Sequence, residues 1–177
     1  MVWKKISSRQ VYKNHWMKVT EDVVKIESGK KFIYGIVHKK PFPLIIPWDG
    51  KYLILVRQYR YPVRSLSWEF PAGHNEVSSI KKVAGRELEE ETGFKAKTLK
   101  KIGLLFLSPG HHTQICHVFF ATGLRKGKQS LDEFEKGMIV KKVTPKKFYE
   151  MVKKGLIKDS PTIAAFGILN TYHKLCS

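Results

Sequence analysis

Short segments rich in apolar and β-branched residues alternate irregularly along this chain with three longer stretches of helical character. This order is the strongest constraint on the fold, because a repeated βαβ architecture needs strands and helices in regular alternation. We therefore expect an α/β or α+β sandwich. In the main part of the chain, the expected strands span residues 44–47, 52–56, 67–70, 98–107, 115–122 and 138–143.

The chain changes character near residue 40. Before this point, residues 11–25 and 32–38 have the pattern of two strands, joined by a polar turn that contains Gly. We therefore expect a small β subdomain over residues 1–40 and a main domain over residues 41–177. A second turn signal, Asp49-Gly50, separates the first two apolar runs of the main domain and predicts a β-hairpin.

Three helices are expected in the main domain, over residues 79–92, 145–154 and about 160–175. The first is followed by Gly93, which can adopt the left-handed conformation that ends helices. The second has Thr144 as its N-cap and Pro145 at its first helical position. The third begins similarly, at Ser160-Pro161.

The chain is strongly basic, with 33 Lys and Arg against 15 Asp and Glu and a formal net charge of +18. Such a charge suits either a polyanionic partner such as nucleic acid or a solvated lysine-rich surface. The lysine pairs are scattered along the chain, so we favour the solvated surface.

No apolar run approaches the roughly 20 residues that a membrane helix needs. The N-terminal residues also lack the apolar core of a signal peptide. We expect a soluble cytoplasmic protein with no membrane partner. Its two cysteines, Cys116 and Cys176, are expected to be reduced thiols.

The first expected helix carries the chemistry. Glu87, Glu90 and Glu91 stand at positions i, i+3 and i+4, so their carboxylates crowd one side of the helix. This arrangement costs stability unless the charges are neutralised, and Mg²⁺ (or Mn²⁺) is the natural agent because hard cations prefer carboxylate oxygens. Arg86 can also pair with Glu90. An ordinary solvated acidic helix is the alternative, but this is the one strongly acidic segment of a basic chain.

Gly73 and the segment 86–94, Arg-Glu-Leu-Glu-Glu-Glu-Thr-Gly-Phe, resemble the Nudix box. The second half of the box matches at every defined position. The first half is one residue shorter between Gly73 and Arg86 than the family pattern, and Ser78 stands where a Glu is usual. The resemblance implies a Nudix-type α/β/α sandwich with a mixed β-sheet, in addition to the small N-terminal antiparallel β subdomain.

The resemblance extends over nearly the whole chain and points to the branch of ADP-ribose and nucleoside diphosphate sugar pyrophosphatases. Its marks are the segments 56–60, 68–73, 108–110 and 132–135. It implies Mg²⁺-dependent hydrolysis of the pyrophosphate of ADP-ribose or a related nucleoside diphosphate sugar. It also implies a homodimer, in which the N-terminal subdomain forms part of the substrate pocket.

The same resemblance implies roles for individual residues. The metal ligands would be the Ala72 carbonyl, Glu87 and Glu91, with Glu90 as a further ligand or as the partner of Arg86. Arg60 would hold the pyrophosphate, for which a guanidinium is well matched, and Arg57 and Glu69 belong to the same set of substrate-binding residues. Trp16 and Tyr34 would stack on the nucleobase, or else belong to the subdomain core or the dimer contact.

The general base is expected in the polar loop 127–137. Glu135 is the first choice and Glu133 the second, with a solvated loop acid as the alternative for either. Two other functions stay open. One is a Nudix hydrolase of capped or polyphosphorylated RNA ends or dinucleoside polyphosphates, and the other is a non-catalytic nucleotide-sensing module. The intact glutamates argue against the module, because a sensor has no need of a destabilising acidic cluster.

Overall fold

The computed structural model describes residues 3–74 and 79–172. It divides into two compact units, described separately here. The first contains the described residues up to Pro41 together with Phe106–Ile115, and the second contains the rest. Ser78, which departs from the Nudix pattern, lies outside the described residues. No helix of the described part is long and apolar enough to cross a membrane.

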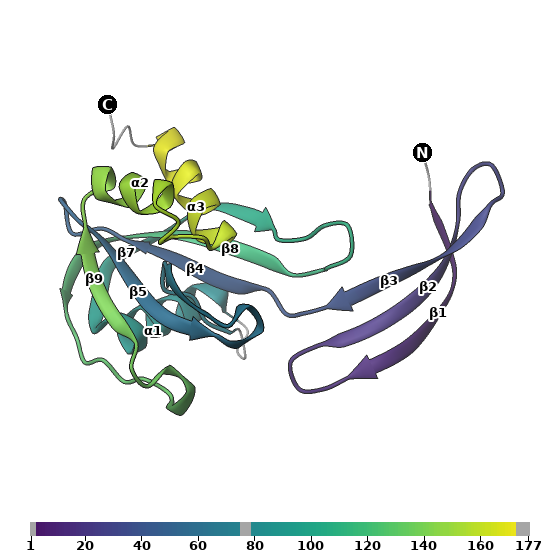
Figure 1. The fold of residues 1–177 in the computed structure, drawn as a ribbon, viewed down its shortest axis with the longest axis horizontal. Helices are drawn as coiled ribbons and strands as arrows, with labels where there is room; N and C mark the ends of the chain where they lie inside the picture. Colours follow the sequence, from purple (N-terminus) through teal and green to yellow (C-terminus); the bar gives the residue numbers. More distant parts are fainter. Residues whose placement is uncertain (1–2, 75–78, 173–177) are drawn as a thin grey trace. The chain divides into compact units, whose positions relative to one another are not determined.

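The first unit is built on an antiparallel sheet of three strands in the order β1-β2-β3 (Figure 1). These strands span Lys4–Lys13, Lys18–Lys25 and Lys31–His38. The central strand β2 buries alternate residues, Thr20, Asp22 and Val24, as expected of a strand sheltered on one face. The antiparallel N-terminal sheet expected from the sequence is confirmed.

The expectation of one continuous strand over residues 11–25 is wrong. The chain turns back between β1 and β2, where the side-chain oxygen of Asn14 accepts hydrogen bonds from the backbone N–H groups of Trp16 and Met17, both at 2.8 Å. Asn favours such turns because its short side chain replaces a backbone acceptor. The sequence therefore contained a turn signal inside what looked like an uninterrupted strand.

Phe106–Ile115 joins the first unit through hydrogen bonds to β3. The backbone N–H of Val37 donates to the carbonyl of His111 at 2.8 Å, and the backbone N–H of Thr113 donates to the carbonyl of Val37 at 3.0 Å. The hydroxyl of Tyr34 donates to the carbonyl of Gly110. This excursion of the chain thus extends the N-terminal unit, although it lies far along the sequence.

The second unit contains two sheets of three strands, ordered β4-β8-β7 and β6-β5-β9. The pairing of β4 with β8 is parallel, whereas β5 pairs antiparallel with both β6 and β9. These strands span Phe42–Pro47 (β4), Leu53–Arg60 (β5), Ser65–Glu69 (β6), Phe94–Phe106 (β7), Ile115–Lys126 (β8) and Ile139–Val143 (β9).

The hairpin predicted around Asp49-Gly50 is also wrong. The turn itself is present, since Asp49 accepts hydrogen bonds from the N–H groups of Lys51 and Tyr52 and Gly50 has a φ of 100°. The strands on either side of it, β4 and β5, enter different sheets and share only the bridge between Trp48 and Leu53. β4 and the first half of β5 are apolar and buried on both faces, which suits strands covered on both sides rather than an exposed hairpin.

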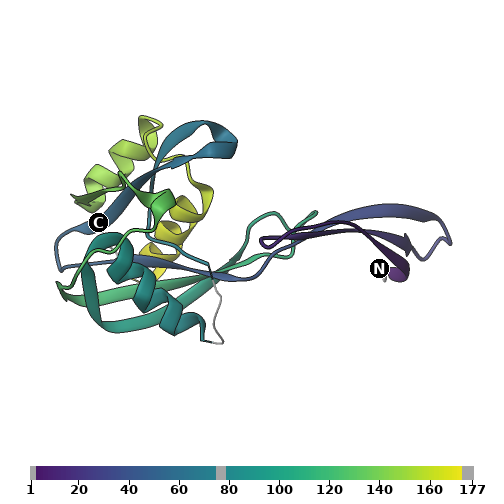
Figure 2. The same cartoon turned by 90° about the horizontal axis from the view of Figure 1, so that it is seen from below.

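Three helices cover these sheets: α1 spans Ile80–Thr92, α2 spans Pro145–Lys153 and α3 spans Ser160–Tyr172. Figures 1 and 2 show α1 on one side of the strands and α2 and α3 on the other. Both expected ends of α1 and the expected start of α2 are confirmed, since Ser79 and Thr144 accept N-cap hydrogen bonds and Gly93 ends α1 with a φ of 73°. The last residues expected in the third helix, 173–175, lie outside the described residues.

Two apolar clusters fix the helices. Ala84 and Leu88 of α1 pack with Ile45 of β4 and with Phe119 and Ala121 of β8. On the other side, Phe148 of α2 lies between Phe70 and Phe166, with ring centroids 5.5 Å and 4.2 Å away. Because one face of α1 packs against β4 and β8, some of the glutamates of this helix are buried.

Candidate active site

The glutamates of α1 differ in burial. Glu91 is 1% exposed and Glu87 is 8% exposed, whereas Glu90 is partly exposed. Glu87 and Glu91 lie one helical turn apart, so they share a face of α1. Ionised carboxylates are almost never this deeply buried unless they are paired or bind a metal.

Glu91 is the most perturbed of the three. Burial raises the pKa of its carboxyl group well above the usual value, and the charges of Glu135 and Glu87 raise it further. A backbone hydrogen bond from Ala72 and the charge of Arg60 act in the opposite direction. Its Oε2 atom is buried and has no hydrogen-bond partner. A buried oxygen without a partner lowers the stability of the folded protein, so its presence indicates a position where a ligand binds.

Glu87 is held between Arg86 and the backbone of Gly73. Its Oε1 accepts a hydrogen bond from Arg86 at 2.7 Å, and a β-carbon added at Gly73 would overlap its carboxyl group. Burial raises the pKa of Glu87, and the bond and charge of Arg86 oppose that rise. The glycine therefore lets the chain approach the carboxylate closely.

Arg86 links two of the glutamates, since its Nε lies 3.4 Å from Glu90 as well. The pKa of Glu90 is raised by burial in spite of Arg86, and by the charges of Asp132 and Glu135. The expected Arg86–Glu90 pair is thus present. Arg86 thus neutralises part of the charge of the cluster.

The two candidate bases occupy different environments. The charge of Glu135 raises the pKa of Glu87, Glu90 and Glu91 alike, which places this side chain within the electrostatic reach of all three. Its Oε2 accepts a hydrogen bond from the N–H of Asp132 at 3.1 Å. Glu133 is 83% exposed and pairs with Lys136 at 3.7 Å.

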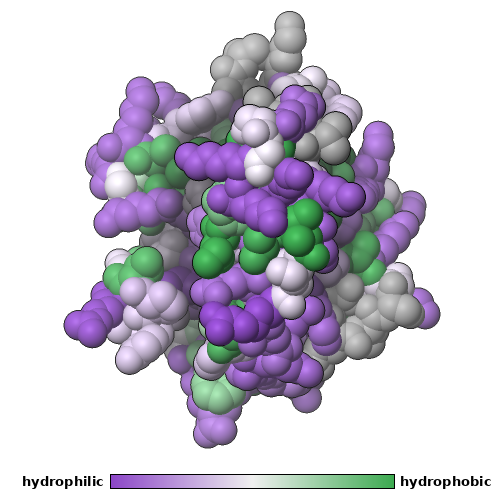
Figure 3. Space-filling model, turned by 90° about the vertical axis from the view of Figure 1, so that its right-hand side faces the viewer, coloured by the Kyte–Doolittle hydropathy of each residue, from purple (hydrophilic) through white to green (hydrophobic). Residues whose placement is uncertain are grey.

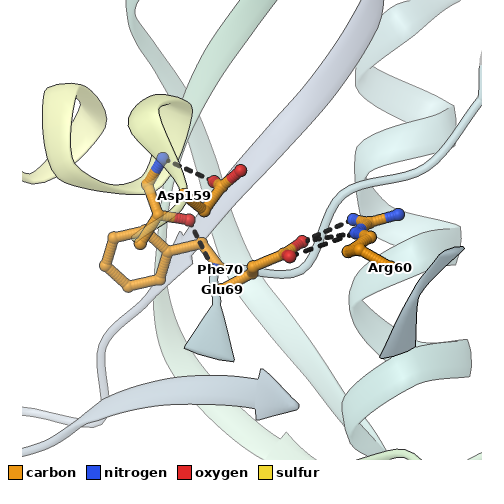
Figure 4. A network of polar contacts seen from close by, with 5 residues as sticks. Arg60, Glu69, Phe70 and Asp159 are labelled. Atoms are coloured by element: carbon orange, nitrogen blue, oxygen red, sulfur yellow. Dashed lines mark hydrogen bonds and ion pairs between the residues drawn. The ribbon is translucent and has the colours of Figure 1, made fainter. Parts of the chain in front are cut away.

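Arg60 and Glu69, both expected to bind substrate, form an ion pair in this structure (Figure 4). The Nε of Arg60 lies 3.1 Å from each carboxylate oxygen of Glu69, and Nη2 also donates to Glu69. Burial alone would lower the pKa of Arg60, but Glu69, Asp159 and Glu91 raise it. The pair therefore extends the charged network from the glutamate helix to the start of α3.

Sequence reasoning missed Asp159 and Thr162 at the start of α3. The side chain of Asp159 accepts a hydrogen bond from the N–H of Thr162 at 2.9 Å, which is the geometry of an N-cap. Burial raises the pKa of Asp159, and the charge of Glu69 raises it further. The signal was available, since Asp immediately precedes the Ser160-Pro161 pair that marks the helix start.

Arg57 faces the indole of Trp68, with its guanidinium carbon 5.3 Å from the ring centroid, and Lys141 lies at the same distance from that ring. The Nε of Arg57 is buried without a hydrogen-bond partner. Arg57 and Trp68 are cross-strand neighbours on β5 and β6. The pairing explains their contact but leaves the predicted role of Arg57 in substrate binding untested.

Trp16 and Tyr34 belong to the first unit. Tyr34 packs edge-on against Trp3, at 5.7 Å between ring centroids, and also contacts Phe32. Trp16 is half exposed in the turn between β1 and β2, beside His15. Tyr34 is therefore part of an aromatic cluster on the N-terminal sheet, and nucleobase stacking by either residue stays a prediction.

The residues around Glu91 fit a divalent cation. Across residues 3–74 and 79–172, no three His, Cys, Asp or Glu side chains converge as a ready metal-binding group. Magnesium needs less than that, because it typically takes one or two protein carboxylates and completes its shell with phosphate oxygens and water. Glu87 and the orphaned oxygen of Glu91 meet that requirement, and the Ala72 N–H, which donates to Glu91, holds the loop beside them.

Comparison with known proteins supports the same interpretation. Residues 41–165 match the NUDIX domain, and residues 3–37 match the nucleoside diphosphate sugar hydrolase N-terminal domain. The chain is 33% identical to the ADP-ribose pyrophosphatase of Bacillus subtilis (strain 168) over 170 residues, which cover 94% of this chain and 91% of that protein. It is 30% identical to the methanol dehydrogenase activator of Bacillus methanolicus, over 97% of this chain and 95% of that protein.

The fold also matches a solved structure described as an ADP compounds hydrolase, with a TM-score of 0.89 and 18% sequence identity. The match covers 98% of this chain and 95% of the other. The expected fold class is thereby confirmed. With a family domain matched over most of its length and a relative 33% identical over 94% of it, the chain belongs to the Nudix hydrolase family.

Proposed function

We propose that this protein hydrolyses the pyrophosphate bond of ADP-ribose or a related nucleoside diphosphate sugar in a Mg²⁺-dependent reaction, with Mn²⁺ as an alternative metal. The products are a nucleoside monophosphate and a sugar phosphate. The observation that carries the proposal is the buried, unpartnered oxygen of Glu91 beside Glu87 and the Ala72 backbone. The names of the similar proteins, which include ADP-ribose and GDP-mannose pyrophosphatases, supply the substrate class.

In this proposal Glu87, Glu91 and the Ala72 carbonyl hold the metal, and Glu90 joins them or remains with Arg86. When bound, the metal stabilises the charge that develops on the phosphate oxygens and favours ionisation of a water. Arg86, whose Nε lies 3.4 Å from Glu90, would balance part of the negative charge of this cluster.

Glu135 orients the attacking water and takes its proton as the water oxygen bonds to phosphorus and the bridging oxygen leaves. Support for Glu135 over Glu133 comes from its charge, which acts on all three α1 glutamates, whereas Glu133 is solvent-exposed and paired with Lys136. A general base must lie near the water that the metal and its ligands position, and Glu135 is the loop glutamate that meets this condition.

Arg60 binds a phosphate group of the substrate with the part of its guanidinium that Glu69 does not occupy. The pair uses Nε and Nη2, and a guanidinium has five N–H donors in total. Glu69 fixes the plane of this fork in advance, so less side-chain entropy is lost on binding. Arg57, stacked on Trp68, supplies a second positive charge on the same pair of strands.

The N-terminal subdomain, residues 1–40, contributes to a homodimer and to the nucleobase site, while residues 41–177 form the catalytic domain. Support comes from its exposed apolar side chains, which are unusual on a free surface: Trp3, Ile6, Val11, Tyr12, Trp16 and Ile33. Figure 3 shows apolar patches among hydrophilic side chains on one face of the molecule. We also propose a cytoplasmic location for the protein, because the proposed substrate is a nucleotide metabolite.

The test is a panel of ADP-ribose, other nucleoside diphosphate sugars, dinucleoside polyphosphates, NADH and capped RNA, each incubated with Mg²⁺. Phosphate released by a coupled phosphatase reports cleavage. We expect ADP-ribose or a nucleoside diphosphate sugar to have the highest kcat/KM. Preference for capped RNA or a dinucleoside polyphosphate would refute the substrate assignment, and binding of ADP-ribose without cleavage would indicate a sensing module.

A further inference from the structure

A buried hydrogen bond connects the start of α3 to the segment that precedes the metal-binding carbonyl. The backbone N–H of Phe70 donates to the side-chain oxygen of Thr162 at 3.0 Å. Thr162 is fully buried and Phe70 is 1% exposed, so water does not compete for this bond. Without its partner, the Phe70 N–H would be a buried, unsatisfied donor.

Asp159 reinforces this contact. Both the backbone N–H and the side chain of Thr162 hydrogen-bond to the Asp159 carboxylate. The result is a short chain of bonds that runs from the Phe70 N–H through the Thr162 hydroxyl to the partly buried carboxylate of Asp159. Each bond in such a chain polarises the next, and the negative end makes the Thr162 oxygen a stronger acceptor.

Phe70 is followed by Pro71 and Ala72, so the anchored amide lies just before the proposed metal-binding carbonyl. The other side of this short segment is fixed to β4. There the backbone N–H of Ile45 donates to the Pro71 carbonyl at 2.9 Å, and Leu44 forms an isolated antiparallel β-bridge with Ala72. Figure 4 shows Phe70 and Asp159 near the start of α3 and the adjacent Glu69 directed toward Arg60. The segment is thus held from two sides, by β4 and by α3.

We infer that Thr162, oriented by Asp159, is a positioning residue that fixes the Ala72 backbone relative to Glu87 and Glu91 and thereby sets the affinity for the metal. The inference rests on the proposed function, in which Ala72, Glu87 and Glu91 are the metal ligands. Thr162 acts through Phe70 and touches neither metal nor substrate. Partners that orient metal ligands typically change metal affinity by about 10- to 100-fold when they are removed.

A purely structural role would give a different pattern. Thr144 is the N-cap of α2 and accepts a hydrogen bond from Lys147 at 3.1 Å, in an exposed position. Thr144→Val removes a threonine hydroxyl that accepts a backbone N–H bond, as that of Thr162 does, but at the start of α2 and away from the loop. It is therefore the matched control for Thr162→Val, which keeps the side-chain shape but loses the acceptor of the Phe70 bond. Thr162→Ser keeps that acceptor.

The experiment measures Mn²⁺ binding to the full-length protein by titration calorimetry, with thermal unfolding recorded in EDTA for the same variants. We expect Thr162→Val to bind Mn²⁺ about tenfold more weakly than wild type, while Thr162→Ser and Thr144→Val keep wild-type affinity. If Thr162→Val fails to fold, Asp159→Asn replaces it, because an amide oxygen still caps α3 but carries no charge. Asp159→Asn should weaken Mn²⁺ binding severalfold.

Wild-type Mn²⁺ affinity in a folded Thr162→Val protein, or in Asp159→Asn when that variant is the one that folds, would overturn the inference and leave the proposed function intact. An equal loss of affinity in Thr144→Val would also overturn it, because helix destabilisation would then explain the effect. A wild-type protein that binds no Mn²⁺ would instead overturn the metal assignment itself.

Discussion

Gly73 lies so close to the carboxylate of Glu87 that a side chain at this position would occupy the same space. The contact joins the loop after β6 to the helix that carries the proposed metal ligands. This contact is a physical reason for a glycine at position 73, in the loop before the acidic helix. A backbone that must approach a carboxylate this closely has no room for a β-carbon.

Gly73→Ala is therefore expected to displace Glu87 and to lower Mg²⁺-dependent activity by about 10- to 100-fold, the usual cost of misplacing a metal ligand. Gly167→Ala is the matched control, because a β-carbon at Gly167 meets nothing within 4 Å and Ala favours the helical conformation of α3. Activity at saturating and limiting Mg²⁺ provides the measurement. Equal activity in the two variants would show that the Gly73–Glu87 approach has no functional importance.

Replacing each candidate base by Gln distinguishes the role of Glu135 from that of Glu133. Glu135→Gln should lower kcat by roughly 10²- to 10⁴-fold, the range associated with loss of a general base. Glu133→Gln, a substitution of the same size in the same loop, should leave kcat near that of wild type because Glu133 is exposed to solvent. The opposite result, an inactive Glu133→Gln and an active Glu135→Gln, would transfer the role to Glu133.

Glu91 should make the metal-free protein less stable at neutral pH. Its pKa is raised by burial, so its contribution to stability is fully present below the unfolded carboxyl pKa of about 4.3 and is lost as pH rises through the folded pKa. In EDTA at pH 8, Glu91→Gln is expected to have a higher Tm than wild type, and the difference should shrink toward pH 4.

Added Mg²⁺ should raise the Tm of wild type but not that of Glu91→Gln, because only the wild type retains both buried ligands. Glu90→Gln serves as the control on the same helix, and its more exposed carboxylate should give a smaller effect in EDTA. The account would be contradicted by a Glu91→Gln protein that is less stable than wild type in EDTA at pH 8.

Cys116 should be unreactive in the folded protein. Burial raises the pKa of its thiol to about 12, so almost no thiolate is present at pH 8. In a Cys176→Ser variant, which leaves Cys116 as the single thiol, a disulfide reagent such as DTNB should react only after denaturation. Rapid reaction of the native protein would show that β8 opens to solvent around Cys116.

Most of the helices and their ends could be predicted from the sequence, because their signals are local. Thr144-Pro145 and Gly93 define ends through contacts with immediate neighbours, and the structure has them where they were expected. The spacing of Glu87 and Glu91 likewise requires only the helical repeat. These features depend on at most five consecutive residues, so no tertiary information is needed.

The errors in strand pairing came from information that is not local. The turn at Asp49-Gly50 is real, but whether β4 pairs with β5 depends on β8, which follows about 70 residues later and pairs with β4 in parallel. The split of residues 11–25 into two strands is the exception, because its signal is local: the Asn14 side chain bonds to the N–H groups two and three residues later.

The polar network of the site also lay beyond sequence reasoning. Arg60 and Glu69 were expected to bind substrate separately, and only the pairing of β5 with β6 brings them together. Asp159 and Thr162 have no place in the acidic helix motif, and the contact of Thr162 with Phe70 spans 92 residues of sequence. Such contacts follow from packing, which spacing alone does not reveal.

The most direct test of the central claim is the steady-state hydrolysis of ADP-ribose by wild type and Glu91→Gln, with Mg²⁺ and with EDTA. We expect wild type to release AMP and ribose 5-phosphate only with Mg²⁺, and Glu91→Gln to lose at least roughly 100-fold in kcat/KM while remaining folded. Undiminished hydrolysis by Glu91→Gln, or equal wild-type activity in EDTA, would contradict the assignment of the buried glutamates as the metal site.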